Sequence, residues 1–369
     1  MIERLYVHNF RCLENFEIVT RELPTALLFG ENGTGKSTVR LALTNLQKIG
    51  RGISRVGDLF VPGDFCRGRS DVPIRIEIDA VIAGRAYNYS LALEFPPNFK
   101  ELRVYEETFR VGGQTVYSRS QAQVTVHGTG ENSEAKFRVD WHLIALAVIQ
   151  IRSEADDLST FKRWLAQMII LAPIPAQMTG DATDGTLEPR VDGADIGDWF
   201  SGVLGRKPAA YAQIDRHLRD IMTDFGEIEH VQIGPNVTRM NISFKKDHAR
   251  LTVPFINLSD GEKCFLLGAL VLSATRVYGP LFCFWDEPDN YLSISEVGRF
   301  VTELRSEFGD AGQLMVTSHN PEAILRFSDE NTFVLHRKSH LEPTLLTRLD
   351  DIKPYGNLAE ALITGDIIP

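Results

Sequence analysis

The residues from Gly30 to Ser37 have the types and spacing that bind phosphate groups. They satisfy the pattern G-x-x-x-x-G-K-[ST], in which glycines let the backbone curve around phosphates so that successive amides point inward. The lysine of this pattern reaches the β- and γ-phosphates, and the hydroxyl residue after it binds Mg²⁺. We therefore predict a nucleoside-triphosphate site formed by Gly30, Glu31, Asn32, Gly33, Thr34, Gly35, Lys36, Ser37 and, at the α-phosphate, Thr38.

Two carboxylates follow an apolar run late in the chain. Leu281 to Trp285 predicts a buried strand, and Asp286 and Glu287 come directly after it. Ligands of open α/β sheets bind at the carboxyl ends of the strands. Asp286 is placed to orient Mg²⁺, and Glu287 to polarise the attacking water. A charged pair that merely caps a strand is the alternative, but the phosphate loop favours the catalytic role.

A third apolar run, Leu314 to Val316, leads to His319. A histidine at this strand end could donate a hydrogen bond to the γ-phosphate and respond to its loss. Lone histidines more often have structural roles, yet this one follows the carboxylates in the order that such a site needs.

Ser259 and Glu262 stand before an apolar segment, Cys264 to Thr275, that predicts a buried helix. Their spacing is that of a capping box, which is a structural role. Phosphate binding is compatible with that role, because a helix start offers free amides and positive potential to an anion.

Alternating element types must hold these residues in place. Ala26 to Phe29 reads as a strand buried on both faces, and Ser37 to Leu46 as a helix after the phosphate loop. Period-two alternation from Ile74 to Phe95, with a hairpin turn at Ala83 to Arg85, predicts the start of an antiparallel sheet. Helical patterns follow at Trp141 to Ile151, Leu158 to Ile170 and Pro208 to Phe225.

These patterns predict an α/β fold with a P-loop core, an inserted antiparallel β subdomain and a helical subdomain. The core is discontinuous, at residues 1–60 and 250–369. The β insertion covers 61–140, and the helical insertion covers 141–249 with a mobile loop at 179–195, where glycine, aspartate and threonine are frequent.

Composition narrows the classes of function. The formal net charge of −10 argues against non-specific coating of nucleic acid, although it permits a local basic patch. The start of the chain cannot serve as a secretory signal, and no stretch approaches the ~20 apolar residues needed to span a bilayer. We expect a cytoplasmic protein with no membrane partner. The four cysteines lack metal-binding or disulfide-framework spacing, and they are Cys12, Cys66, Cys264 and Cys283.

Taken in order, the motifs resemble those of the ATP-binding-cassette (ABC) ATPases, specifically the soluble RecF/SMC-like group that includes overcoming-lysogenization-defect and Septu-like proteins. The opening, with Asn9-Phe10-Arg11, looks like the first strand of that group. Gly30 to Ser37 resembles its Walker A motif, and Leu258 to Glu262 its signature motif. Asp286-Glu287-Pro288 resembles Walker B, and His319 the switch histidine. The resemblance covers roughly residues 1–50 and 250–335.

The resemblance implies an ABC-type ATPase head that uses ATP and Mg²⁺ and dimerises around ATP. It implies catalytic roles for Glu287, His319 and Lys36. The implied nucleotide contacts beyond the phosphate loop are Arg11, Ser259, Gly261 and Glu262, and the implied metal ligands are Ser37, Asp286 and Gln177. In the resemblance, the Ser259 helix start closes the site of the opposite subunit.

The sequence departs from the pattern of the group at three places. The signature motif reads Ser-Asp-Gly where Ser-Gly-Gly is more usual. The segment after Pro288, Asp289 to Ser293, lacks the Leu-Asp of the usual dimer-contacting loop, and the glutamine loop, assigned to Gln177, is not marked by a clear motif.

The leading hypothesis is an ATPase switch that dimerises around ATP and acts on nucleic acid or on an effector partner, such as a nuclease, in anti-phage defence. The alternative is a RecF-like DNA-repair clamp that binds DNA directly. Its support is a basic run whose members are Lys48, Arg51, Arg55, Arg67 and Arg69, although such a run can also be a solvated surface. A transporter energising subunit is a weaker third hypothesis.

Overall fold

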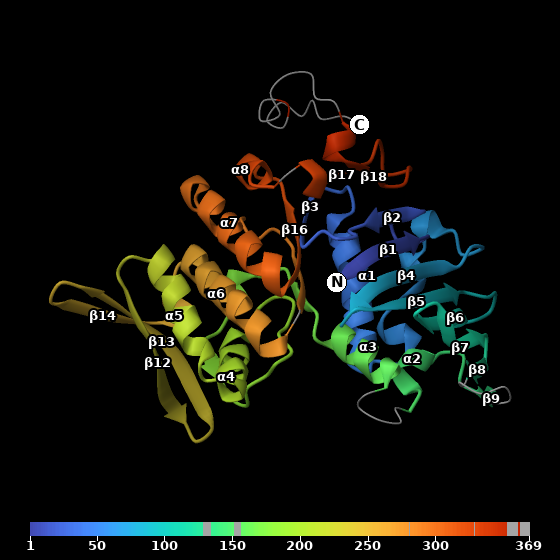
Figure 1. Cartoon of the computed structure of the whole chain (residues 1–369), viewed down its shortest axis with the longest axis horizontal. Helices are drawn as coiled ribbons and strands as arrows, with labels where there is room; N and C mark the ends of the chain where they lie inside the picture. The colour runs from blue at the N-terminus through green and yellow to red at the C-terminus, as the bar shows by residue number, and fades with distance from the viewer. Residues whose placement is uncertain (128–133, 151–155, 280, 328, 353–360, 362–369) are drawn as a thin grey trace. The chain divides into compact units, whose positions relative to one another are not determined.

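The structure is a computed structural model that describes residues 1–127, 134–150, 156–279, 281–327, 329–352 and 361. The chain forms two compact units. The first unit comprises Met1–Met168 and Asp329–Pro369, and the second comprises Ile169–Ser328. Each is described on its own, with the element labels of Figure 1.

An antiparallel sheet of eight strands dominates the first unit, in the order β2-β1-β4-β5-β6-β7-β8-β9. From β4 onward each strand pairs with the next in sequence, as Figure 1 shows by the gradual change from blue to teal. The strands are β1 Ile2–His8, β2 Phe16–Val19, β4 Ile74–Ile82, β5 Arg85–Glu94, β6 Arg103–Val111, β7 Gln114–Ser120, β8 Gln123–His127 and β9 Glu134–Arg138.

The alternation predicted from the sequence is confirmed in this sheet. Ile74, Ile76 and Ile78 are buried, while the residues between them lie on the other face. The turn from β4 to β5 is made by Ala83 and Gly84, which have φ angles of 49° and 79°. Two left-handed residues are what a two-residue hairpin turn requires.

The first unit also contains a smaller ladder at the phosphate loop. Strand β3, Thr25–Phe29, pairs in parallel with β17, Thr332–His336, and β17 pairs antiparallel with β18, Leu345–Arg348. Helix α1, Lys36–Gly50, begins inside the predicted phosphate loop. It packs against α3, Asp157–Ala166, where a Cβ on Gly50 would lie only 2.6 Å from the Ala166 nitrogen.

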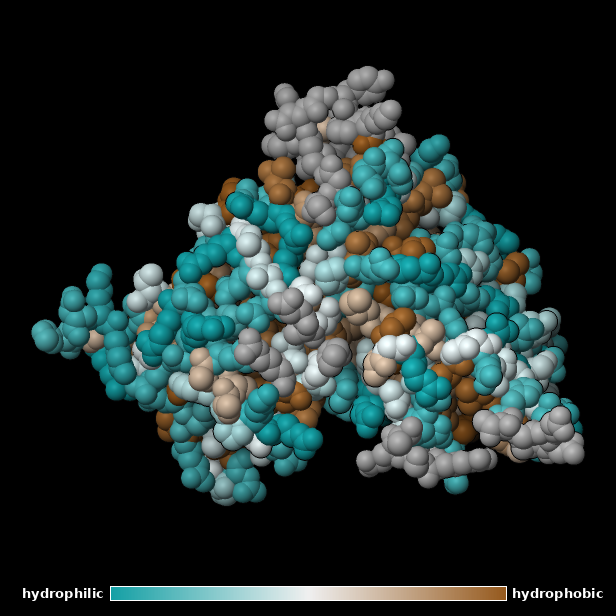
Figure 2. All heavy atoms as spheres, in the orientation of Figure 1, coloured by the Kyte–Doolittle hydropathy of each residue, from teal (hydrophilic) through white to brown (hydrophobic). Residues whose placement is uncertain are grey.

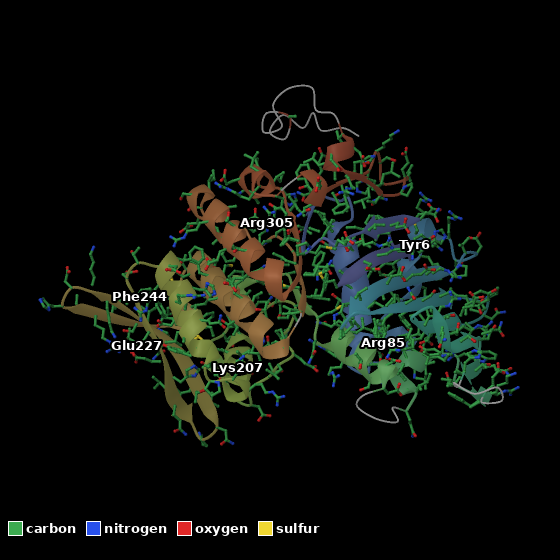
Figure 3. The ribbon with its side chains drawn as sticks, in the orientation of Figure 1. Tyr6, Arg85, Lys207, Glu227, Phe244 and Arg305 are labelled. Atoms are coloured by element: carbon green, nitrogen blue, oxygen red, sulfur yellow. The ribbon has the colours of Figure 1, made fainter. Side chains whose placement is uncertain are left out.

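A buried charged cluster ties the antiparallel sheet to the short helix α2, Ala145–Val148. Glu107 on β6 accepts hydrogen bonds from the hydroxyls of Tyr89 and Tyr117, at 3.0 and 2.8 Å. It also accepts from the amides of Ala145 and Leu146, both at 2.8 Å. The Arg119 guanidinium lies 3.7 Å from the same carboxylate, and both side chains are fully buried. Nearby, Arg85 (labelled in Figure 3) pairs with Asp157 of α3 at 2.6 Å.

The second unit has a parallel ladder of three strands, in which β15 pairs with both neighbours. The strands are β10 Ile169–Leu171, β15 Leu281–Trp285 and β16 Gly312–Ser318. All five residues of β15 are buried, which confirms the expectation of a strand covered on both faces. Helix α6, Asp260–Tyr278, is buried along most of its length and packs against α5 and α7. The other helices are α4 Ile196–Arg206, α5 Ala210–Ile221, α7 Ile294–Ala311 and α8 Pro321–Leu325.

An arm of three antiparallel strands completes the second unit. It consists of β12 Phe225–Gly234, β13 Val237–Lys246 and β14 Ala249–Pro254, and the short strand β11 Asp181–Ala182 pairs with β13. Glu227, labelled in Figure 3, pairs with Lys245 at 2.7 Å and with Arg250 at 3.1 Å. The visible surface of the arm is mainly hydrophilic (Figure 2).

The structure differs from the sequence prediction within residues 141–249, which were expected to be helical. Of the run from Trp141, only Ala145–Val148 is helical, and residues 151–155 lie outside the described residues. The predicted helix Leu158 to Ile170 ends at Ala166, because Ile169–Leu171 is a strand that pairs with β15. Strands β11 to β14 occupy much of the remainder. Burial in a sheet outweighed the local helical pattern.

The segment 179–195, predicted to be a mobile loop, is held by hydrogen bonds. The Asp198 carboxylate accepts from the amides of Thr183 and Asp184, at 2.6 and 3.1 Å, and the Thr179 amide donates to the Ala194 carbonyl at 3.1 Å. One-turn helices occupy Val56–Asp58, Pro62–Asp64, Cys66–Gly68, Pro175–Gln177, Phe255–Asn257, Asp329–Asn331 and Leu349–Asp351. Within the described residues, no helix combines the length and the apolar character needed to cross a membrane.

Candidate active site

The phosphate loop has a backbone that only glycine accepts at several positions. Gly33 and Gly35 have φ angles of 82° and 107°, in the left-handed region. A Cβ on Gly30 would lie 2.4 Å from the carbonyl oxygen of Leu335, on the neighbouring strand β17. The loop therefore lies tightly against β17, and its left-handed glycines give it the curvature of a phosphate cradle.

Lys36 lies inside the curve of this loop and is only 6% exposed. Its Nζ donates to the carbonyls of Gly30 and Glu31, at 2.6 and 3.1 Å. The Thr34 hydroxyl donates to the same Glu31 carbonyl at 2.8 Å and closes the loop. The side chains of Glu31 and Asn32 are exposed, so the loop would meet phosphate through its backbone and Lys36.

Residues distant in sequence hold the phosphate loop where it enters α1. The Thr344 hydroxyl donates to the Thr34 carbonyl at 2.7 Å, and the Thr344 amide donates to the Cys12 carbonyl at 3.0 Å. Cys12 Sγ lies 3.4 Å from the hydroxyl of Thr38 on α1. A Cβ on Gly35 would lie 2.9 Å from that sulfur. Cys12 and Thr344 therefore pack against the loop where it enters α1.

Arg11 lies in a bend whose shape depends on Asp64. Its backbone is left-handed, with φ of 53°, and its amide donates to the Asp64 carbonyl at 2.6 Å. Its Nε donates to the Asp64 carboxylate at 2.8 Å, while half of the side chain stays exposed. The predicted contact of Arg11 with a nucleotide would thus compete with an ion pair inside the first unit.

The carboxylates lie in the second unit, at the carboxyl ends of its parallel strands. The Asp286 amide donates to the Leu171 carbonyl at 2.7 Å, which joins the ends of β15 and β10. Thr317, at the end of β16, donates from its hydroxyl to Asp286 Oδ1 at 2.6 Å. The same hydroxyl accepts from the Glu287 amide at 2.9 Å. One buried threonine therefore holds both the carboxylate of Asp286, the predicted Mg²⁺ ligand, and the backbone of Glu287, the predicted base.

Glu287 has a strained backbone and a constrained side chain. Its φ angle is 52°, which is uncommon for a residue other than glycine. Asn290 Nδ2 donates to Oε2 at 2.5 Å, and His319 Nε2 contacts Oε1. Strain of this kind persists only where surrounding contacts hold it, and it is concentrated at functional sites. The structure thus brings Glu287 and His319 together, whereas the predicted partner of His319 was the γ-phosphate.

Asp289 is a buried carboxylate two residues after Glu287. It is 5% exposed and accepts from the Ser318 hydroxyl at 2.8 Å. Its second oxygen, Oδ1, has no hydrogen-bond partner among the described residues. Burial therefore raises the pKa of the Asp289 carboxyl, and the Ser318 hydrogen bond only partly opposes this effect.

The predicted signature helix begins with the capping box expected from its sequence. The Ser259 amide and hydroxyl donate to the Glu262 carboxylate at 2.8 and 2.7 Å, and the Glu262 amide donates back to Ser259 Oγ at 3.3 Å. Ser259 is exposed, and a Cβ on Gly261 would lie 3.0 Å from the Tyr291 carbonyl. The helix start therefore lies beside the loop that follows the carboxylates, with Ser259 and Asp260 exposed.

Gln177 lies on a one-turn helix, Pro175–Gln177, after strand β10. Lys263 Nζ donates to the Pro175 carbonyl at 3.1 Å and fixes this turn to the start of α6. The Gln177 side chain is exposed. Its position beyond the carboxyl end of β10 is compatible with the predicted role in metal binding.

The basic run from Lys48 to Arg69 does not form a free cationic surface in the first unit. Arg55 pairs with Glu101 at 2.9 Å, and Arg67 and Arg69 both pair with Glu14. Arg51 donates to the Ala166 carbonyl at 3.1 Å. Engaged charges of this kind reduce the local positive potential that nucleic-acid binding needs.

The residues present fit ATP and Mg²⁺. The glycine cradle and the Lys36 ammonium suit phosphate oxygens, and a hydroxyl with one carboxylate is a typical protein contribution to a phosphate-bound Mg²⁺. Within the described residues, no three His, Cys, Asp or Glu side chains gather into a metal-binding group. A Mg²⁺ ion held here would therefore need oxygen ligands from the bound phosphates as well.

Sequence reasoning missed three residues that shape this site. Thr317 carried a weak signal, since it precedes His319 by two positions at a strand end. Asn290 follows the carboxylates but belongs to no motif that we recognised. Thr344 carried no signal, because 310 residues separate it from Thr34.

Comparison with known proteins concerns the fold. No protein-family profile matches the chain, and no curated protein matches it. Solved structures do match. The SMC head bound to the C-winged helix domain of ScpA has a TM-score of 0.57 and 15% identity, over 95% of this chain and 98% of that chain.

An SMC head domain with an extended coiled coil, bound to the C-terminal domain of ScpA and derived from Pyrococcus furiosus, has a TM-score of 0.51. Its identity is 13%, over 95% of this chain and 97% of that chain. The predicted fold class is thus confirmed, and the SMC-like resemblance is supported at the level of fold. The Septu-like grouping stays a prediction. The chain has the fold of an SMC head, which is an ABC-type ATPase fold.

Proposed function

We propose that this protein is an ATPase that hydrolyses ATP to ADP and phosphate and couples the reaction to dimerisation. The observation that carries the proposal is the arrangement of Glu287. Its carboxylate is held by Asn290 and His319, and its strained backbone by Thr317, next to Asp286 at the end of a buried parallel strand. A carboxylate held so firmly suits a general base that must meet one water in one orientation.

The chain's own groups divide the work. The amides of the phosphate loop and Lys36 hold the β- and γ-phosphates. Ser37 and Asp286, with Gln177 by resemblance, would hold Mg²⁺, which supplies positive charge at those phosphates. Glu287 accepts a proton from the attacking water, and His319 keeps the Glu287 carboxylate in position. By the resemblance, the phosphate loop and the carboxylates act on one nucleotide.

Two substitutions test the chemistry. Lys36→Ala removes the cation inside the loop, so ATP binding should be lost. Glu287→Gln keeps the shape but removes the base, so binding should persist while hydrolysis falls by about 10²–10⁴-fold. Equilibrium binding and phosphate release measure the two effects. Glu322→Gln, which changes a half-buried carboxylate on α8 paired with Arg326, is the matched control and should be active. Normal turnover in Glu287→Gln would reject the assignment.

We further propose that the Ser259 helix start acts on the nucleotide of a second copy. Its support is that Ser259 and Asp260 are exposed at the start of α6, next to the segment in which Tyr291 and Ile294 are 40% and 74% exposed. Exposed apolar side chains that form a contiguous patch mark interfaces. In this dimer, Ser259, Gly261 and Glu262 would face the γ-phosphate across a two-fold axis.

Light scattering on Glu287→Gln should show a dimer with ATP and Mg²⁺, and Ser259→Arg should abolish both dimer and turnover. Thr252→Arg, on the exposed strand β14, is the control for an added charge. Full turnover in Ser259→Arg would defeat the proposal even if the protein were a dimer without ATP.

The output of the switch is proposed to be an effector protein, in cytoplasmic anti-phage defence, rather than DNA bound directly. The SMC heads named above were solved with a domain of ScpA bound, and the basic run expected to bind DNA is engaged in ion pairs. Salt-sensitive DNA binding that Arg51→Glu and Arg55→Glu abolish would favour the DNA-repair clamp instead. Pull-down from the native host that recovers a nuclease or toxin would support the effector.

A further inference from the structure

The loop between β17 and β18, residues 337–344, reaches the phosphate loop from the far end of the sequence. Strand β17 runs parallel to β3, with Val334 opposite Phe29, so both strands end at the same edge. Ligands bind beyond that edge in parallel sheets. The loop after β17 therefore leaves its strand at the place where the phosphate loop leaves β3.

Hydrogen bonds hold this loop both at its last residue and within it. Thr344 is buried, and it bonds to the carbonyls of Thr34 and Cys12 as described above. Arg337 donates from Nε to the Glu342 carbonyl at 2.7 Å and from Nη2 to the His340 carbonyl at 2.5 Å. Arg67 donates to the Leu341 carbonyl at 3.0 Å. These bonds hold the backbone of the loop in one shape.

His340 is the side chain that this shape presents to the phosphate loop. Its Nε2 would lie 3.9 Å from a Cβ on Gly33, whose amide belongs to the phosphate cradle. The imidazole is exposed, and no hydrogen bond of its ring is found among the described residues. Lys338 places an exposed ammonium group on the same loop, and Glu342 is the one carboxylate of the loop.

We propose that the loop 337–344 is a phosphate-contacting arm in which His340 donates a hydrogen bond from Nε2 to the polyphosphate of the bound nucleotide. Thr344 acts as a positioning residue, because its hydroxyl holds the Thr34 carbonyl and so the curvature of the phosphate loop. This inference rests on the proposed function and adds to it a group that no sequence motif marks. The imidazole lies within van der Waals reach of a Cβ placed on Gly33, next to the backbone that would hold the phosphates.

The test compares ATP with inorganic triphosphate, which has the phosphates but lacks the nucleoside. His340→Ala should weaken binding of both by about tenfold or more, as expected for a lost hydrogen bond to a charged group. His248→Ala removes an exposed histidine of the β13–β14 turn and should leave both affinities unchanged. Weaker ATP binding with unchanged triphosphate binding would place His340 at the nucleoside and overturn the proposal. Unchanged affinity for both ligands would also overturn it.

Thr344 is tested by its hydroxyl. Thr344→Val should lower the affinity for both ligands by about tenfold. Thr344→Ser, which keeps the hydroxyl, should bind them as the wild-type protein does. In the wild-type protein, hydrogen exchange of the amides from 338 to 342 should slow when ATP is added. Equal affinity in Thr344→Val, or exchange that ATP does not alter, would refute the arm. If the wild-type protein binds neither ligand, the proposed function itself fails, which separates that failure from failure of His340 alone.

Discussion

Substitution of Glu107 by glutamine should destabilise the first unit strongly although the residue lies outside every motif. Glu107 accepts four hydrogen bonds at 2.8 to 3.0 Å, and its carboxylate lies 3.7 Å from the buried Arg119. Glutamine has nearly the same shape but keeps only one acceptor oxygen. The glutamine amino group fits best at the position of Oε2, which now accepts a hydrogen bond from the Ala145 amide. Two donors would then face each other, and the Ala145 amide would lose its acceptor.

The magnitude follows from these losses. One unsatisfied buried donor costs about 1–3 kcal/mol, and removing one partner of a buried ion pair costs about 3–5 kcal/mol. Because the two losses share one side chain and are not additive, we expect about 3–5 kcal/mol in total. For a unit of this size, Tm falls by about 2–4 °C per kcal/mol. Glu107→Gln should therefore lower the Tm of the first unit by roughly 6–20 °C.

Glu106→Gln is the matched control, because it makes the same change one position earlier on the opposite face of β6. Glu106 is 45% exposed and pairs with Arg75 at 3.0 Å, so its loss should cost about 0–1 kcal/mol. Scanning calorimetry without nucleotide measures both variants. If the two variants melt within about 2 °C of each other, the buried cluster does not stabilise the unit as argued.

Three further predictions concern the site. Thr317→Val should leave ATP binding intact but reduce phosphate release about tenfold or more, because the Glu287 amide loses the hydroxyl that accepts its hydrogen bond. Turnover equal to that of the wild-type protein would show that the threonine is dispensable. Asp289→Asn should raise stability at pH 7 by about 1 kcal/mol. Burial raises the Asp289 pKa, so the folded state binds more protons than the unfolded state. The stability of the wild-type protein should therefore fall as pH rises from about 4, and the stability of Asp289→Asn should not show this fall. Urea titrations at each pH measure both stabilities. Gly35→Ala, at φ 107° and 2.9 Å from Cys12 Sγ, should abolish ATP binding in equilibrium dialysis, and retained affinity would mean that the loop tolerates the strain.

Local patterns in the sequence were sufficient to predict a feature wherever the contacts that determine it lie close together along the chain. The hairpin at Ala83 and Gly84 depends on two residues in sequence, and the Ser259–Glu262 capping box on four. The phosphate loop is likewise contained in Gly30 to Ser37, and an unbroken apolar run before Asp286 predicted β15. Short-range hydrogen bonds and backbone preferences determine these features, so their residues predict them.

Contacts between distant segments were decided by the tertiary structure alone. Ile169 to Leu171 reads as the end of a helix, and only pairing with β15 makes it a strand. Thr344 reaches Thr34 across 310 residues, and Glu107 joins a sheet to a helix start 38 residues later. No periodicity or spacing records such pairs, because they arise when packing brings segments together. The sequence by itself determined which chemistry is present, and the fold determined which residues hold it in place.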